Sequence, residues 1–167
     1  EIISKLVEYE ERNELLKNEC IKLVSDNRNV MILSERRNHC IKLYEMINEH
    51  YGTEMCGLYM GQMKQSELEE SEKKQVIIAT YSLAHEGLDI PKLDSLIMAT
   101  SKGDVVQAVG RILRETPGKM HDPYVIDVVD NIAPMMNQYR KRSQFYKKSG
   151  FSFEDKPVEI EELTKLH

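Results

Sequence analysis

The sequence lacks any apolar run that approaches the ~20 residues needed to cross a bilayer, and its first residues lack the charged-then-apolar layout of a signal peptide. With only 8 glycines and 5 prolines in 167 residues, it is neither collagen-like nor of low complexity. Its three cysteines, Cys20, Cys40 and Cys56, have no C-x-x-C spacing. We therefore expect a soluble, intracellular protein with reduced, packed thiols and no metal site.

Excess positive charge is also missing, because 23 basic side chains face 28 acidic ones and the net charge is −5. The whole molecule is therefore not a polycation that coats nucleic acid, and any such contact must be local. One basic cluster, with aromatic residues interleaved, lies between Arg140 and Lys148, although such a run is usually a solvated helix face. Residues 151–167 are acidic and weakly patterned, which predicts a tail or a linker.

Three nucleotide-binding motifs are absent. No G-x-x-x-x-G-K-[ST] phosphate loop occurs, since Pro117-Gly118-Lys119-Met120 lacks both the leading glycine and the hydroxyl that would hold magnesium. There is no D-E-x-[DH] strand end, and no G-x-G-x-x-G that would indicate a dinucleotide site. The sequence alone is therefore not a complete ATPase.

Short apolar runs that alternate with stretches of helical periodicity are present instead, and they predict βα units around a parallel sheet buried on both faces. The expected strands are Val30–Ser34, Cys56–Tyr59, Val76–Thr80, Ser95–Ala99 and Tyr124–Val129. A leading helix is expected within residues 1–27, and Asp130 is expected to open a helix that carries Tyr139.

The most informative helix is expected to begin at Asp104. Its Gln107, Arg111 and Arg114, spaced i, i+4 and i+7, share one face, and Gly110 lies on the same side, where a bulky anion could approach. Two guanidinium groups one turn apart can clamp a polyphosphate in bidentate fashion. The alternative is an ordinary surface helix with two solvated arginines.

The pattern Gln107-x-x-Gly110-Arg111-x-x-Arg114 resembles the last conserved motif of superfamily 2 helicases. Upstream, the stretch from Val76 to Pro91, which ends in Gly87-Leu88-Asp89-Ile90-Pro91, looks like the fifth motif of that family. The turn from Leu33 to His39 and the stretch from Tyr139 to Phe151 look most like XPB-type helicases of large DNA viruses and phages.

The resemblance implies a RecA-like fold, a doubly wound parallel sheet of five or six strands with helices on both faces. Residues 1–150 would form the second motor lobe and 151–167 would lead to a missing segment. ATP and Mg²⁺ would be held mainly by the first lobe of the same chain, which closes against this one, so the parent would be an ATP-dependent helicase and this piece alone inactive.

The resemblance also assigns roles to individual residues. Arg114 would be the arginine finger, Arg111 would hold the same phosphate region, and Gln107 would link nucleotide to nucleic acid. Gly87, Asp89 and Gly110 would line the nucleotide side, although Asp89 is also a plausible turn residue before Pro91.

Nucleic-acid contacts are expected at the carboxyl ends of the strands, where ligands gather in open α/β sheets. These candidates are Thr80, Ser34, Arg36, Arg37, Gly61, Lys64 and Thr100, with at most one of the adjacent arginines a firm contact. DNA is favoured and RNA is possible, and a viral parent would act in a cytoplasmic replication factory or the virion. The competing hypothesis is an inactive helicase-like docking module.

Overall fold

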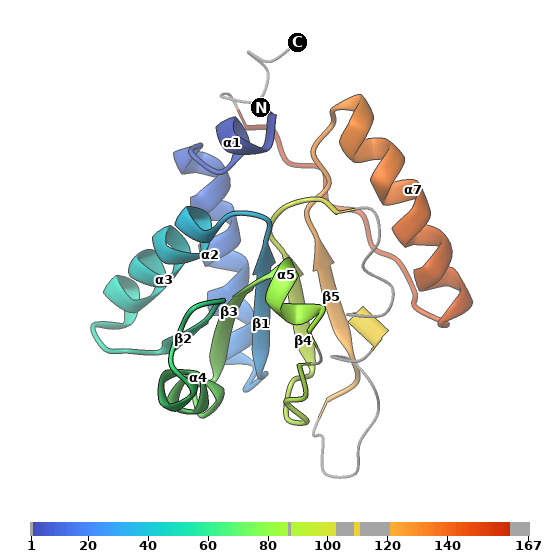
Figure 1. Ribbon diagram of the computed structural model, residues 1–167. Coiled ribbons are helices and arrows are strands. Elements are labelled where there is room, and N and C mark those ends of the chain that lie inside the picture. Colours follow the sequence, from blue (N-terminus) through green and yellow to red (C-terminus); the bar gives the residue numbers. More distant parts are fainter. Residues whose placement is uncertain (1, 87, 103–108, 111–120, 161–167) are drawn as a thin grey trace.

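The computed structural model describes residues 2–86, 88–102, 109–110 and 121–160, which form a layered α/β structure (Figure 1). Its strands are β1 (Val30–Ser34), β2 (Cys56–Tyr59), β3 (Val76–Thr80), β4 (Ser95–Met98) and β5 (Tyr124–Asp127). They form one sheet in the order β2-β3-β1-β4-β5, and every neighbouring pair is parallel. The predicted fold class is confirmed.

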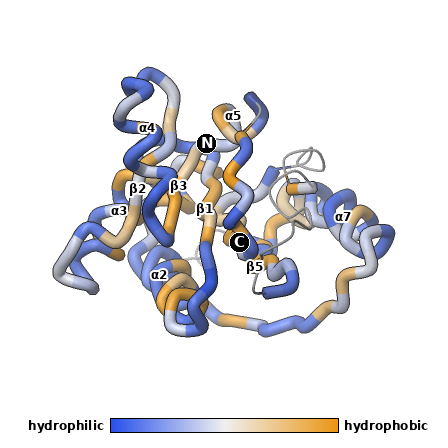
Figure 2. The backbone as a smooth tube through the Cα atoms, turned by 90° about the horizontal axis from the view of Figure 1, so that it is seen from below, coloured by the Kyte–Doolittle hydropathy of each residue, from blue (hydrophilic) through white to orange (hydrophobic). Residues whose placement is uncertain are grey.

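Helices cover both faces of the sheet. On one face, α2 (Glu10–Ser25) and α3 (Arg37–Tyr51) pack Leu16, Cys20 and Leu43 against Val30, Ile32 and the other strand residues of that parity. On the opposite face, α5 (Tyr81–Ala84) and α7 (Ala133–Lys148) pack Tyr81 and Tyr146 against Met31 and Leu33. Because both faces are buried, the strands read as continuous apolar runs, and Figure 2 shows β1 and β3 in hydrophobic colours.

Two predicted helix starts differ from the structure. The leading region contains two helices, α1 (Ile2–Leu6) and α2, rather than one. Asp130 does not cap a helix, because α7 begins at Ala133 with Ile132 as its N-cap. The Asp130 carboxylate binds Arg12 instead, which shows that a long-range partner outcompeted the local cap.

One close approach fixes α4 (Gln65–Glu72) against β2. Gly57 lies so near α4 that a Cβ atom placed on it would sit 2.6 Å from Ser71 Cα. Only glycine therefore allows this helix to lie against the edge strand. Elsewhere, Gly52 ends α3 in the left-handed conformation with φ 66°.

Residues 151–160 run back from the end of α7 past β5 toward α2, and Ile160 is buried. Together with α2 and β5 they border a groove of about 420 Å³. The division at residue 150 and the linker role of the tail stay predictions.

Candidate functional site

The carboxyl ends of β1, β3 and β4 meet at one rim of the sheet. Here β1 continues into α3 on one face, whereas β3 continues into α5 on the other, so the rim lies at a topological switch point. Ser34 and Thr80 are register partners, and Thr100 Oγ1 accepts a hydrogen bond of 2.8 Å from the backbone N–H of Glu35. The structure thus brings three of the predicted nucleic-acid residues together.

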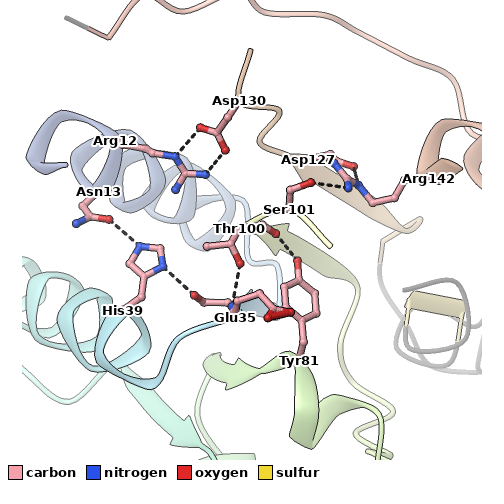
Figure 3. Close-up of polar contacts among 11 residues, drawn as sticks. Arg12, Asn13, Glu35, His39, Tyr81, Thr100, Ser101, Asp127, Asp130 and Arg142 are labelled. Carbon is pink, nitrogen blue, oxygen red and sulfur yellow. Dashed lines mark hydrogen bonds and ion pairs between the residues drawn. The ribbon is translucent and has the colours of Figure 1, made fainter. Parts of the chain in front are cut away.

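The hydroxyl of Ser34 points inward at this rim. Its Oγ lies 2.8 Å from His39 Nδ1, and His39 Nε2 lies 2.7 Å from Asn13 Oδ1 (Figure 3). Asn13 Nδ2 donates a hydrogen bond to Val7 O, so Asn13 Oδ1 must accept one from the Nε2–H group of His39. The Nδ1 atom of His39 therefore carries no proton and accepts a hydrogen bond from the Ser34 hydroxyl. Ser34, at 0% exposure, therefore has its hydrogen committed to the interior.

His39 is neutral in this chain of hydrogen bonds. Burial, helped by the nearby Arg12 guanidinium, lowers the pKa of His39 to about 3. A neutral imidazole fits this arrangement, because its unprotonated Nδ1 can accept the hydrogen bond from the Ser34 hydroxyl. This chain of hydrogen bonds from Ser34 through His39 to Asn13 thus ties α2 to the end of β1 and the start of α3.

The remaining predicted contacts lie toward the β2 side. Arg37 is exposed and donates to Gly61 O at 2.8 Å, so these two residues are brought together. Arg36 is half-buried, with its guanidinium 3.9 Å from the Glu35 carboxylate. Lys64 is exposed at the N-cap of α4, where its backbone N–H donates to Glu67.

The loop Thr100–Lys102 is held from several directions. Tyr81 Oη donates to Thr100 O at 2.7 Å, and the Lys102 ammonium pairs with the Glu35 carboxylate. Lys102 also lies over the Tyr81 ring, 5.7 Å from its centroid. Burial is the main reason that the pKa of Tyr81 is raised well above its usual value, so the phenol remains a hydrogen-bond donor.

The predicted phosphate clamp follows this loop. Gln107, Arg111, Arg114 and Gly87 lie outside the described residues, so their roles stay predictions. Asp89 and Gly110 are described, and both are exposed. A Cβ atom on Gly110 would meet Phe145 of α7 at 3.9 Å, an ordinary contact distance.

Two buried ion pairs were not expected from the sequence. Arg12, at 0% exposure, donates from Nε and Nη2 to both oxygens of Asp130, each at 2.8 Å. Arg142 forms a similar fork with Asp127. A signal for the second pair existed, because Asp127 interrupts an apolar strand and Arg142 lies two turns from Met135 on the buried side of α7.

The basic cluster of α7 therefore consists of one buried residue and four exposed ones. Arg142 is buried and cannot reach an external ligand, which corrects its inclusion in a candidate surface. The exposed members are Arg140, Lys141, Lys147 and Lys148. Their helix has no acidic residue, so they form a positively charged face on an acidic chain.

The part of the chain that the structure describes holds no group of three or more His, Cys, Asp or Glu side chains that could bind a metal ion. Its helices include none that is long and apolar enough to span a membrane.

Comparison with protein families gives one match that spans most of the chain. A model described as the helicase conserved C-terminal domain matches residues 11–116. The chain is 34% identical over 155 residues to a candidate ATP-dependent RNA helicase of Acanthamoeba polyphaga mimivirus, covering 92% of this chain and 30% of that protein. It is 25% identical over 167 residues to a counterpart from African swine fever virus, covering 89% of this chain and 33% of that protein.

Solved structures support the fold. T4 UvsW superposes with a TM-score of 0.67 at 20% identity, covering 89% of this chain and 35% of that one. Domain 2 of the DEAD-box helicase Mss116p, bound to an RNA duplex, superposes with a TM-score of 0.60 at 13% identity, covering 98% and 63%. The chain spans about a third of the length of the two viral relatives.

Proposed function

The chain belongs to the helicase conserved C-terminal domain family, and from this we propose that it is the second motor lobe of an ATP-dependent nucleic-acid helicase or translocase. The first lobe, with the phosphate loop and acidic box that this sequence lacks, would belong to the longer protein. Within the family, we propose that the parent is most similar to XPB-type helicases, because the turn from Leu33 to His39 and the stretch from Tyr139 to Phe151 resemble theirs.

One observation supports this proposal most. The loop Thr100–Lys102, tied to β1 through Glu35 and to α5 through Tyr81, leads directly into the segment with Gln107, Arg111 and Arg114. The strand-end rim proposed for nucleic acid is thereby linked to the residues that would act on ATP. In this proposal Arg114 stabilises the charge that develops on the γ-phosphate, and Arg111 and Gln107 hold the groups around it.

ATP and Mg²⁺ would be bound mainly by the first lobe. Asp89 and Gly110 would contribute from this side, and their exposure is compatible with a facing nucleotide. Bound ATP supplies the γ-phosphoryl group whose hydrolysis drives opening of the closed lobes. The chain itself would orient that group and exclude bulk water, other than the attacking water molecule, when the lobes meet.

DNA or RNA would lie along the strand-end rim. Gly61, Arg37 and Lys64 would contact backbone phosphates, and Arg36 would be the weaker of the two adjacent arginines. Thr80, Ser34 and Thr100 would support these contacts from within the rim, because their side chains are buried and hydrogen-bonded there. Each ATPase cycle would pass phosphates from one lobe to the other.

The test uses the full-length parent and compares Arg114→Ala and Arg111→Ala with wild type in nucleic-acid-stimulated ATP hydrolysis. We expect Arg114→Ala to lower kcat by about 10³–10⁵-fold, as for known arginine fingers, while nucleic-acid affinity is retained. Lys73→Ala is the control, because Lys73 is exposed and pairs only with Glu70 among the described residues.

Turnover within about threefold of wild type in both arginine variants would refute the proposal.

Nucleic-acid binding is measured on the full-length parent as well. Arg37→Ala should weaken binding equally for unrelated sequences and flatten the salt dependence by about one counterion. If only charge reversal at Arg140 and Lys141 abolishes binding, the exposed face of α7 is the nucleic-acid site instead.

A further inference from the structure

A single buried guanidinium joins the last helix to the loop that precedes the predicted arginine finger. Arg142 donates to the Asp127 carboxylate from Nε at 2.7 Å and from Nη2 at 2.8 Å. Its Nη1 donates to Ser101 Oγ and to Lys102 O, both at 2.9 Å (Figure 3). Arg142 is 1% exposed, and four of its five N–H groups donate hydrogen bonds to these three residues.

Asp127 fixes the guanidinium in turn. It follows Ile126 in β5 and also accepts a hydrogen bond of 2.8 Å from Tyr146 Oη, one turn further along α7. Burial alone would lower the pKa of Arg142, but hydrogen bonding and attraction to Asp127 outweigh it and raise that pKa. The charge is therefore permanent, and the planar fork has one orientation.

The same loop is also held by α5 and by Glu35, which follows β1. Thr100 receives hydrogen bonds from Tyr81 Oη and from the Glu35 backbone N–H, while Lys102 pairs with the Glu35 side chain. Thr100 is therefore tied to α5 and to Glu35, Ser101 to α7, and Lys102 to both α7 and Glu35.

Helix α7 contacts the chain again beyond the loop. Val109 is buried in the same core cluster as Tyr146, and Phe145 packs against that cluster. Phe145 also lies beside Gly110, at 3.9 Å from where a Cβ atom would be. Helix α7 thus meets the chain both just before residue 103 and at residues 109–110.

We propose that Arg142 is a positioning residue, which places the segment bearing Gln107, Arg111 and Arg114 by fixing Ser101 and Lys102. This inference rests on the proposed function, because it assigns a purpose to the loop only if Arg114 acts on ATP. A displacement of about 1 Å in a catalytic group can cost roughly 10²-fold in rate, so a tight anchor has a large effect.

The first experiment replaces Arg142 by lysine in the full-length parent. Arg142→Lys keeps the charge beside Asp127, but one ammonium group cannot reproduce the fork to a carboxylate and to two loop acceptors. We expect kcat for stimulated ATP hydrolysis to fall about 10–100-fold, with KM for ATP and nucleic-acid affinity within about threefold.

Arg28→Lys is the matched control. Arg28 also donates from Nη1 to a serine hydroxyl and to a backbone carbonyl, those of Ser95 and Asp122, but at the opposite end of the strands. It should leave kcat within about twofold of wild type, whereas an equal loss in both variants would overturn the positioning role.

The second experiment separates positioning from simple loss of structure by a double-mutant cycle. In an Arg114→Ala background, measured under single-turnover conditions with excess enzyme, Arg142→Lys should cause a clearly smaller further loss than it causes in wild type, because one of the three residues that it positions is gone. Losses that multiply would overturn the inference while leaving the proposed function intact. An Arg114→Ala variant that keeps full turnover would instead refute the proposed function.

If Arg142→Lys does not fold, Tyr81→Phe tests the same loop through the single hydrogen bond to Thr100 O. Tyr44→Phe is its control, since that phenol donates at the same 2.7 Å to Glu54, away from the rim. A fall in kcat for Tyr81→Phe alone supports the positioning of the loop, and equal rates in the two variants overturn it.

Discussion

Replacing Arg12 by methionine should be the most damaging single change in α2. The side chains of Arg12 and Asp130 are 0% and 1% exposed, and the two hydrogen bonds between them join α2 to the segment that follows β5. Arg12→Met would keep much of the buried aliphatic volume while leaving the Asp130 carboxylate without its partner. Removing one member of a buried pair typically costs about 3–5 kcal/mol.

The same reasoning predicts recovery in a double variant. Arg12 Nη1 has no hydrogen-bond partner among the described groups, so the intact pair already contains an unsatisfied buried donor. Arg12→Met/Asp130→Leu removes that donor together with both charges. We expect the double variant to be within about 1–2 kcal/mol of wild type, because apolar replacement of a whole buried pair is often neutral or stabilising.

Urea unfolding of the 167-residue chain, followed by circular dichroism, measures both effects. With a slope near 2 kcal/mol per M, Arg12→Met should lower the midpoint by about 1.5–2.5 M. Lys17→Met, which breaks the more exposed pair with Glu14, should cost at most about 1 kcal/mol. A loss below about 1 kcal/mol for Arg12→Met, or a double variant as unstable as the single one, would refute the argument.

Two further predictions concern stability. Because the pKa of His39 is lowered in the folded state, the unfolded state binds a proton between about pH 6.5 and pH 3 that the folded state does not bind. The free energy of unfolding should therefore fall by up to about 1.4 kcal/mol per pH unit as the pH drops through this range. The urea midpoint should therefore change more between pH 7 and pH 5 in wild type than in His39→Gln, and equal changes in the two proteins would contradict the neutral imidazole. Gly57→Ala should lower the free energy of unfolding by about 1–3 kcal/mol, because the added Cβ atom would overlap Ser71. Gly61→Ala, with open space around the residue, should melt within about 1 °C of wild type, and equal melting temperatures for the two variants would show that α4 moves aside at no cost.

The sequence was sufficient to predict the sheet because its strands are buried on both faces. Val30–Ser34, Cys56–Tyr59 and Val76–Thr80 match the observed strands, since each apolar run ends where turn or helix signals begin. Strand ends were less accurate at β5, which stops at Asp127 rather than Val129. There the side chains are only partly buried, so the apolar pattern continues past the last ladder pair.

The polar part of the site could be predicted only in outline. Grouping Thr80, Ser34 and Thr100 at one rim follows from parallel strands alone. The partner of Arg12 lies 118 positions away, and neither periodicity nor spacing connects two such residues before the strand order is known. Arg142 was hidden for a related reason, because its basic neighbours made it look like part of a solvated face.

The strand order also has a consequence for biosynthesis. Central strand β1 is translated first, yet its partners are β3, beginning at Val76, and β4, beginning at Ser95, about 45 and 65 residues later. At about 5–20 residues per second, the ribosome needs roughly 3–13 s to deliver the second partner. Helix α2 precedes β1 and can already shield one face, but the face that carries Met31 and Leu33 must wait. The nascent chain thus passes through an interval in which its central strand, fully buried in the folded protein, has two unpaired edges and one uncovered face, and this is the stage at which a chaperone would have most to protect.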